Sequence, residues 1–303
     1  MILGKYRDAL LNRLRPGLIR MGYHSKPGFL IIGAQKAGTT SLYYYLSEHP
    51  NIVPGYEKEI GFFSPELFEN WPENPKHHIL CIRKGDDFFD PRPYPKAAAW
   101  YHSHFPLPHE LGWQRITYEA TPEYLYYPEV AARIHKYSPT IKLIALLRDP
   151  VERAFSAWNM YCSFGNGNYR PFTYAPRRET RGFDEAVQAE LDIMQSDPAV
   201  LDPGYIRRGL YFEQLTQYFK IFECDQILIL DSNELRTKAS SVVEKVFDFL
   251  GLPGYRHTGE WPSHIVGTYQ IQLSGKTLRL LREFYKPHNE RLYQLLDHDF
   301  GWQ

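Results

Sequence analysis

The sequence GAQKAGTT, Gly33 to Thr40, lies between the apolar run FLII and the segment SLYYYL. Its glycines have the G-x-x-x-x-G spacing of a phosphate-binding loop. In nucleotide hydrolases a lysine directly follows the second glycine, whereas here Thr39 follows Gly38 and the lysine is Lys36. A strand before such a loop and a helix after it place backbone amides where anions bind. The stretch therefore predicts a strand–loop–helix unit that binds phosphate, with its cation displaced.

Short apolar runs recur along the chain and suit strands that are buried on both faces. They occupy residues 29–32, 116–119, 141–147 and 226–231. Amphipathic patterns that predict helices occupy residues 39–49, 128–139, 149–162, 183–195, 205–222, 240–252 and 277–296. Buried strands that alternate with helices predict an α/β fold, a P-loop-like central parallel sheet flanked by helices on both faces.

The helix boundaries have their own signals. Thr39 is a suitable cap for the helix after the glycine loop, and Pro50 follows its end. In RDPVERAF, Asp149 is expected as the N-cap, Pro150 as the first helical residue, and Glu152 as the third residue that completes a capping box. Both helices would begin at the carboxyl end of a strand.

One domain is expected over residues 28–303, preceded by a basic amphipathic extension at 1–27. Residues 51–116 are rich in proline, glycine and aromatic residues and predict loops and short helices. The polar stretch at 163–182 predicts a surface insertion. For the extension the sequence leaves two placements open: packing on the body of the protein, or peripheral membrane contact through residues 1–20.

The charge balance, the cysteine content and the lack of long apolar runs limit the classes of protein to which this chain can belong. The 35 basic and 35 acidic residues balance, so no overall field attracts nucleic acid. Three widely spaced cysteines make no disulfide framework and suit a reducing compartment. No run approaches 18 apolar residues, and the first residues lack the apolar core of a signal peptide. These features predict a cytoplasmic protein rather than a Golgi-lumenal one.

Three strand ends carry candidate site residues, and parallel strands bring them to one edge of the sheet. The first is the glycine loop, where the amides from Ala37 onward and the hydroxyls of Thr39 and Thr40 can bind a phosphate beside Lys36. The second is EATP, which contains Glu119. The third is RDP, where Arg148 replaces the aspartate that would organise magnesium in a kinase. We therefore expect no metal.

Arg148 and Ser156 predict a second phosphate site. One lies at the strand end and the other on the second turn of the following helix, so a guanidinium and a hydroxyl can face one anion. Together with the glycine loop, they indicate a ligand with two separated phosphate groups. Paired histidines at 77–78 and 102–104 do not form a metal set, because no carboxylate or cysteine completes it at ligand spacing.

These residues resemble the sulfotransferases that use 3′-phosphoadenosine 5′-phosphosulfate (PAPS) as sulfuryl donor. IIGAQKAGTTSL is similar to their 5′-phosphosulfate loop, LLRDPVERAFSAW to their 3′-phosphate motif, and EKEIGFF to a segment of the heparan-sulfate-type and related carbohydrate members. The resemblance spans residues 28 to 300. It implies the sulfotransferase fold, PAPS as donor, 3′-phosphoadenosine 5′-phosphate (PAP) as product, and a carbohydrate-like acceptor, with an anionic polysaccharide as one candidate.

The resemblance also implies residue roles. Lys36 would stabilise the leaving phosphate, and Glu59 would be the general base. Ala37, Gly38, Thr39 and Thr40 would bind the 5′-phosphate, and Arg148 and Ser156 the 3′-phosphate. Apart from the resemblance, the basic blocks at Arg83–Lys84, Arg177–Arg181 and Arg207–Arg208 are expected to line a groove for an anionic polymer. The expected acceptor residues are therefore Lys58, Glu119, Arg83 and Arg208. For Glu119 two roles stay open, a reserve base or a carboxylate that orders the neighbouring loops.

Two departures from that family stand out. Where heparan-sulfate-type members carry K-G-R near the C-terminus, this chain has Val266, Gly267 and Thr268, so Gly267 alone is expected to contact the donor. Where they carry E-K-T-P, this chain has Ala120 in place of the lysine. An identical glycan acceptor is therefore not expected. The alternatives are a P-loop-type kinase of a nucleoside or small molecule, and a nucleotide-binding interaction protein without activity.

Overall fold

The computed structural model describes residues 14–69, 76, 95–164, 178–197, 199–201, 204–252, 254–259, 261–262 and 274–302. Within these ranges the centre is a five-stranded sheet in the order β2-β3-β1-β4-β5, and all neighbouring strands are parallel. The strands are β1 (Pro27–Gly33), β2 (Ile52–Pro54), β3 (Ile116–Ala120), β4 (Lys142–Leu147) and β5 (Ile227–Asp231).

Helices connect the strands. The α-helices are α2 (Thr39–Ser47), α4 (Pro95–His102), α5 (Pro108–Leu111), α6 (Val130–Tyr137), α7 (Pro150–Ser163), α8 (Phe183–Ser196), α9 (Tyr211–Phe219), α10 (Ser232–Thr237), α11 (Ala239–Leu250) and α12 (Gly275–Leu296). Short 3-10 helices are η1 (Pro65–Phe68), η2 (Pro122–Leu125), η3 (Arg207–Gly209) and η4 (Cys224–Gln226). None of the helices in the described ranges is both long enough and apolar enough to cross a bilayer.

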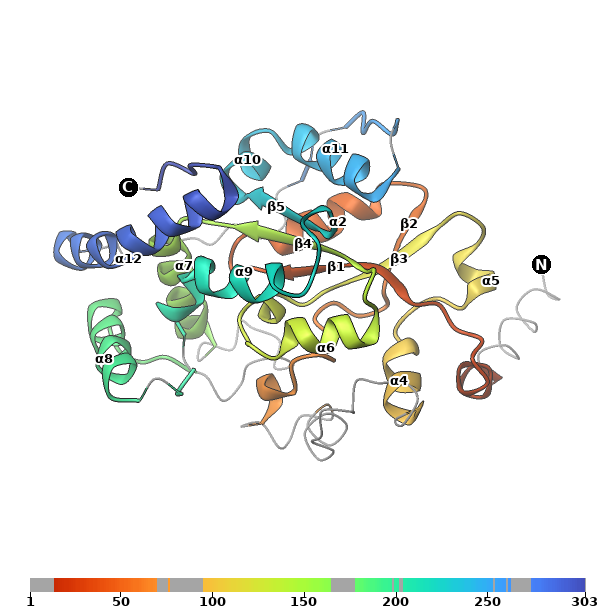
Figure 1. Ribbon diagram of the computed structural model, residues 1–303, viewed down its shortest axis with the longest axis horizontal. Helices are drawn as coiled ribbons and strands as arrows, with labels where there is room; N and C mark the ends of the chain where they lie inside the picture. Colours follow the sequence, from red (N-terminus) through yellow and green to blue (C-terminus); the bar gives the residue numbers. More distant parts are fainter. Residues whose placement is uncertain are drawn as a thin grey trace.

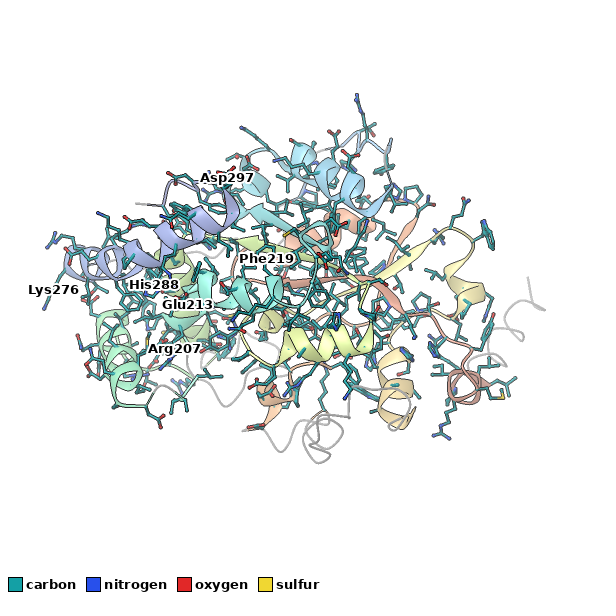
Figure 2. All side chains as sticks on the ribbon, in the orientation of Figure 1. Arg207, Glu213, Phe219, Lys276, His288 and Asp297 are labelled. Carbon is teal, nitrogen blue, oxygen red and sulfur yellow. The ribbon has the colours of Figure 1, made fainter. Side chains whose placement is uncertain are left out.

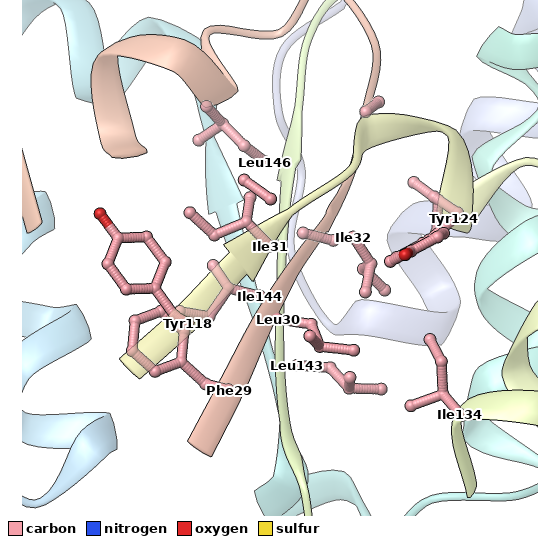
Figure 3. Close-up of a cluster of buried hydrophobic side chains, with 14 of the residues drawn as sticks. Phe29, Leu30, Ile31, Ile32, Tyr118, Tyr124, Ile134, Leu143, Ile144 and Leu146 are labelled. Carbon is pink, nitrogen blue, oxygen red and sulfur yellow. The ribbon is translucent and has the colours of Figure 1, made fainter. Parts of the chain in front are cut away.

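The sheet is covered on both faces, as the sequence predicts. Figure 1 shows α2, α10 and α11 on one face and α6 and α9 on the other. Figure 3 shows why the strand sequences are continuously apolar: Phe29 and Ile31 of β1 point to one side, and Leu30 and Ile32 point to the other. All four side chains are fully buried. Burial on both faces therefore stabilises the central strand that leads into the glycine loop.

The C-terminal helix α12 packs against α9 and α7 near the carboxyl ends of the strands. Figure 2 shows His288 of α12 beside Glu213 of α9, and Nδ1 of His288 lies 2.9 Å from Glu213 Oε1, within hydrogen-bond distance. Tyr285 of α12 donates to the carbonyl of Ile206 over 2.8 Å. These contacts hold the segment around η3 and α9 next to α7, which carries part of the candidate site.

The four predicted strands are confirmed, and the structure corrects the details of three elements. Thr39 is not the cap of α2, because Gly38 occupies that position and Thr39 is the first helical residue. Asp149 caps α7 as predicted, but the capping box is wrong: the Glu152 carboxylate accepts hydrogen bonds from Arg148 instead.

The helix predicted over 205–222 is interrupted. It consists of η3 and α9, separated at Leu210, whose backbone angles are not helical. Gly209 lies where a Cβ would stand 2.8 Å from atoms of Pro150 and Tyr285, so the interruption allows close packing against α7 and α12. The three-residue strand β2 was not predicted, since it is too short to show a pattern.

The extension packs on the body of the protein where it is described. Residues 14–20 are helical, and Arg15 forms a 2.9 Å ion pair with Glu110. Its guanidinium lies 4.9 Å from the ring centre of Tyr56. Residues 1–13, which carry most of the predicted membrane-contact segment, lie outside the described residues, as do residues 165–177 of the predicted insertion.

Gly33→Ala is expected to destabilise the protein by about 1–3 kcal/mol, because it forces overpacking at the end of β1. A Cβ on Gly33 would stand 2.6 Å from Leu125 Cβ and 2.9 Å from Leu125 Cδ2. Urea unfolding followed by circular dichroism measures the change. Gly17→Ala is the control, because a Cβ there meets nothing within 4 Å. Equal unfolding midpoints for Gly33→Ala and the wild type would contradict the expectation.

Candidate active site

The glycine loop after β1 has the backbone of an anion-binding turn. Gly38 has φ 98° and is the N-cap of α2, so its left-handed conformation requires glycine. Lys36 is also left-handed, with φ 68°. The first amides of a helix have no acceptor within the helix. Those of Thr39 and Thr40 therefore lie where an anion can accept their hydrogen bonds.

A buried glutamine holds this loop to the two neighbouring strand ends. Gln35 Nε2 donates to Glu123 Oε1 over 3.1 Å and to the hydroxyl of Tyr161 over 3.3 Å. Glu123 lies in η2 after β3, and Tyr161 lies in α7 after β4. The amide of Ala34 donates to the carbonyl of Leu146 over 2.7 Å. The loop is thus fixed between the segments that carry the other candidate residues.

Arg148 and Lys36 meet at the carboxyl ends of β4 and β1. Arg148 Nη1 donates to the Lys36 carbonyl over 3.2 Å, and the Arg148 carbonyl accepts from the hydroxyl of Tyr211 over 2.9 Å. Lys36 Nζ lies 3.6 Å from Met160 Sδ, a weak acceptor. Burial and then the charge of Arg148 lower the pKa of Lys36 to about 8. Two cations are therefore close together in a position that favours an anion between them.

Ser156, the second residue of the predicted 3′-phosphate site, lies on α7 and is only 6% exposed. It follows the N-cap Asp149 by two helical turns, on the helix that begins next to Arg148. Asp149 is further bound by Arg282 of α12 in an ion pair of 2.5 Å. The start of α7 is thus tied to the body of the protein.

Glu59 lies beside the end of β3 in a left-handed conformation, with φ 62°. Such a backbone costs about 1–3 kcal/mol in a residue other than glycine and persists only where its surroundings hold it. Its amide donates to the Ala120 carbonyl over 2.9 Å, and its carboxylate forms an ion pair with Lys58. The negative charge of Glu59 raises the pKa of Lys36 against the larger effect of burial. The candidate base and the candidate leaving-group cation are thus within electrostatic reach of each other.

Glu119 is fully buried, and its carboxylate is enclosed by hydroxyl donors. Thr121 Oγ1 and the hydroxyl of Tyr124 each donate to Oε1 over 2.7 Å, and the hydroxyl of Tyr101 donates to Oε2. Burial raises the pKa of Glu119, and these bonds offset part of the rise. The contacts join β3, η2 and α4, which fits the open alternative of a carboxylate that orders the neighbouring loops.

The predicted basic groove is wrong for Arg208. Its side chain is 2% exposed, and its guanidinium lies 4.1 Å from the ring centre of Tyr126. It is buried next to Gly204, so it does not line an open surface. Arg181 is occupied by Glu179 in a 2.7 Å ion pair. Arg83 and Gly267, the other predicted contacts, lie outside the described residues.

Sequence reasoning missed three polar residues around the site. Gln35 is inside the glycine motif, and its polar side chain beside Lys36 was the available signal. Arg153 is fully buried on α7 and donates to the carbonyl of Tyr205. Lys76 donates to the Glu59 carbonyl over 2.9 Å from a region with no recognisable pattern. Across the described residues, no three His, Cys, Asp or Glu side chains form a group that could hold a metal ion.

Comparison with known proteins assigns the chain to one family. Residues 26–261 match the model of the sulfotransferase domain family, and the chain belongs to that family. A crystal structure of a sulfotransferase from Alicyclobacillus acidocaldarius superposes with a TM-score of 0.65 at 27% identity, over 91% of this chain and 98% of that one.

Two curated members of the family are similar to this chain in sequence. Human heparan sulfate glucosamine 3-O-sulfotransferase 3A1 is 30% identical over 94% of this chain and 64% of its own length. The membrane-associated sulfotransferase kil1 of Dictyostelium discoideum is 26% identical over 91% of this chain and 66% of its own length. The chain thus spans about two thirds of the length of the curated relatives it matches.

Proposed function

We propose that the protein transfers a sulfuryl group from PAPS to a hydroxyl or amine of a carbohydrate-like acceptor. The proposal rests on the placement of three charged residues at the same edge of the sheet. Lys36 follows β1, Arg148 follows β4, and Glu59 is bound to the end of β3. The match to the sulfotransferase domain family supports sulfuryl transfer over the phosphoryl transfer of a P-loop kinase.

The residues present fit a donor with two phosphate groups. The left-handed Gly38 leaves the first amides of α2 available, and Lys36 lies in the same loop. We assign the 5′-phosphosulfate to Lys36, Ala37, Gly38, Thr39 and Thr40. Arg148 and the buried Ser156 follow β4 and are assigned to the 3′-phosphate. PAPS supplies the activated sulfuryl group.

The side chains divide the chemistry between them. The sulfuryl group leaves a phosphate oxygen and forms a bond to the acceptor oxygen or nitrogen. Glu59 takes the proton that the acceptor loses, and Lys36 neutralises the charge that develops on the leaving phosphate. Lys58 forms an ion pair with the Glu59 carboxylate, the group that would accept the proton.

A carbohydrate acceptor is supported by the relatives whose names specify heparan sulfate. Ala120 replaces the lysine expected beside the acceptor in heparan-sulfate-type members, so we propose a related but different glycan. Because Arg208 is buried, we do not retain it as a direct acceptor contact. Glu119, enclosed by hydroxyl groups, is proposed to order the loops around the acceptor.

A cytoplasmic location with peripheral membrane contact through residues 1–20 stays a prediction. The relative kil1 is described as membrane-associated, but the described part of the extension packs on the body of the protein. Cell fractionation of the full chain beside a variant that lacks residues 1–13 tests whether the extension brings it to membranes.

The function is tested by transfer from ³⁵S-labelled PAPS to a panel of heparan sulfate, chondroitin, desulfated glycans, glycolipids and simple alcohols. We expect labelled product with at least one carbohydrate. ATP with magnesium serves as the alternative donor. Phosphate transfer from ATP would revive the kinase alternative. Tight PAP binding without transfer to any acceptor would favour the inactive nucleotide-binding protein.

A further inference from the structure

We propose that Lys76 is a positioning residue that holds the backbone of Glu59 in the geometry required for proton abstraction. The inference rests on the proposed function, because it presumes that Glu59 is the base. Lys76 was not among the residues that the sequence singled out. Its role follows from the contacts that its ammonium group makes with the segment from Glu57 to Glu59.

The ammonium group of Lys76 bridges two residues of this segment. Nζ lies 2.9 Å from the Glu59 carbonyl oxygen, to which it donates, and 2.6 Å from Glu57 Oε1. It also lies 5.6 Å from the ring centre of Phe68 in η1. The side chain of Lys76 is only 14% exposed. A shielded ammonium group that makes two charge-assisted bonds fixes the path of the chain between its acceptors.

Glu57 accepts the second bond of the Lys76 ammonium group, and its own carboxylate is fixed by His104. Its second carboxylate oxygen lies 3.2 Å from Nε2 of His104. Burial alone would raise the pKa of Glu57, but the bond from His104 and the charge of Lys76 hold it at about 2. The carboxylate is therefore charged at neutral pH, and its ion pair with Lys76 persists there.

Glu59 needs such support because its backbone is left-handed. Its amide is bound on one side to the Ala120 carbonyl at the end of β3. Its carbonyl is bound on the other side to Lys76. If the second bond is lost, the residue can relax towards an ordinary conformation, which rotates the Cα–Cβ bond and moves the carboxylate away from the acceptor.

The proposal is tested with Lys76→Met, which keeps most of the length of the side chain and removes the charged ammonium group. We expect kcat to fall about 10- to 100-fold with the fastest acceptor of the panel, since a misplacement of 1 Å costs rates of this order. PAP affinity, measured by calorimetry, should be unchanged. Lys76→Arg keeps the charge and should recover most of the rate.

Lys142→Met is the matched control. Lys142 also donates to a backbone carbonyl, that of Phe249, and lies 5.0 Å from the ring centre of the same residue. It is located at the start of β4, at the opposite end of the sheet from the site. This variant should match Lys76→Met in any loss of stability and keep its kcat.

Hydrogen exchange of the PAP-bound protein supplies a readout that needs no acceptor. The amides of Glu59 and Gly61 are bonded to the Ala120 carbonyl and to Thr121 Oγ1. We expect peptides that cover residues 57–61 to exchange faster in Lys76→Met than in Lys142→Met. If Lys76→Met does not fold, Glu57→Gln weakens the same bridge and should change exchange and kcat in the same direction.

The double variant Lys76→Met with Glu59→Gln separates the two proposals. If Lys76 acts through Glu59, the double variant is no slower than Glu59→Gln alone. Unchanged exchange and kcat in Lys76→Met, while Glu59→Gln is inactive, would overturn the positioning role only. A raised acceptor KM with unchanged kcat would overturn it in favour of a direct acceptor contact. Full transfer activity of Glu59→Gln would overturn the assignment of Glu59 as the base, whereas no transfer from PAPS by the wild type to any acceptor of the panel would overturn the proposed function itself.

Discussion

Glu59→Gln is expected to lower kcat for sulfuryl transfer about 10²–10⁴-fold, the usual contribution of a general base. Glutamine preserves the shape of the side chain but cannot accept the acceptor proton. The backbone bonds to Ala120 and Lys76 do not involve the carboxylate, so the fold around residue 59 should persist. PAP affinity should be unchanged because the proposed role of Glu59 is towards the acceptor and not towards the donor. Transfer assays and calorimetry with PAP measure the two quantities.

Glu110→Gln is the control for loss of a carboxylate, because Glu110 also pairs with a basic side chain, that of Arg15. It should keep its activity. Glu119→Gln tests the alternative base: the amide nitrogen would meet hydroxyl donors in a buried site, so we expect reduced stability and a normal kcat for the folded fraction. An active Glu59→Gln together with a folded but inactive Glu119→Gln would reverse the assignment.

The fold could be predicted from the sequence because the signals are local. The strands β1 and β4 are buried on both faces, so each appears as an uninterrupted apolar run. In the loop before α2, the position with φ 98° is occupied by glycine, Gly38, as a left-handed backbone requires. The start of α7 shows Asp149 and Pro150 in the order that a capped helix requires. Parallel strands then place these motifs at one edge of the sheet.

What the sequence did not show depends on contacts between distant segments. Lys76 reaches the carbonyl of Glu59 from 17 residues away, and no spacing rule describes that bond. Arg208 belongs to a basic pair that is typical of a solvated face, but its guanidinium is buried on the ring of Tyr126. The choice between the two roles left open for Glu119 depends on what surrounds its carboxylate. Tyr101 and Tyr124 provide those surroundings, and the sequence does not show that they contact Glu119.

Lys36→Met is expected to lower kcat/KM for PAPS about 10²–10³-fold, comparable to the removal of one preorganised donor to a developing negative charge. Methionine replaces the apolar part of the lysine side chain and removes the ammonium group with its charge and its donors. Arg148, which contacts the Lys36 carbonyl, provides the comparison: Arg148→Met should weaken PAP binding more than it lowers kcat. Retained transfer by Lys36→Met would rule out the proposed mechanism.

The pH dependence follows from the same residue. Burial and the neighbouring Arg148 lower the pKa of Lys36 to about 8, so the free enzyme loses this positive charge as the pH rises through 8. The charged form is the one that neutralises the donor, so kcat/KM for PAPS should decline as the pH rises above 8, since kcat/KM reports groups of the free enzyme. Lys36→Arg keeps its charge throughout this range and should show no decline, whatever its absolute rate. A decline of the same shape in Lys36→Arg would assign the titration to another group.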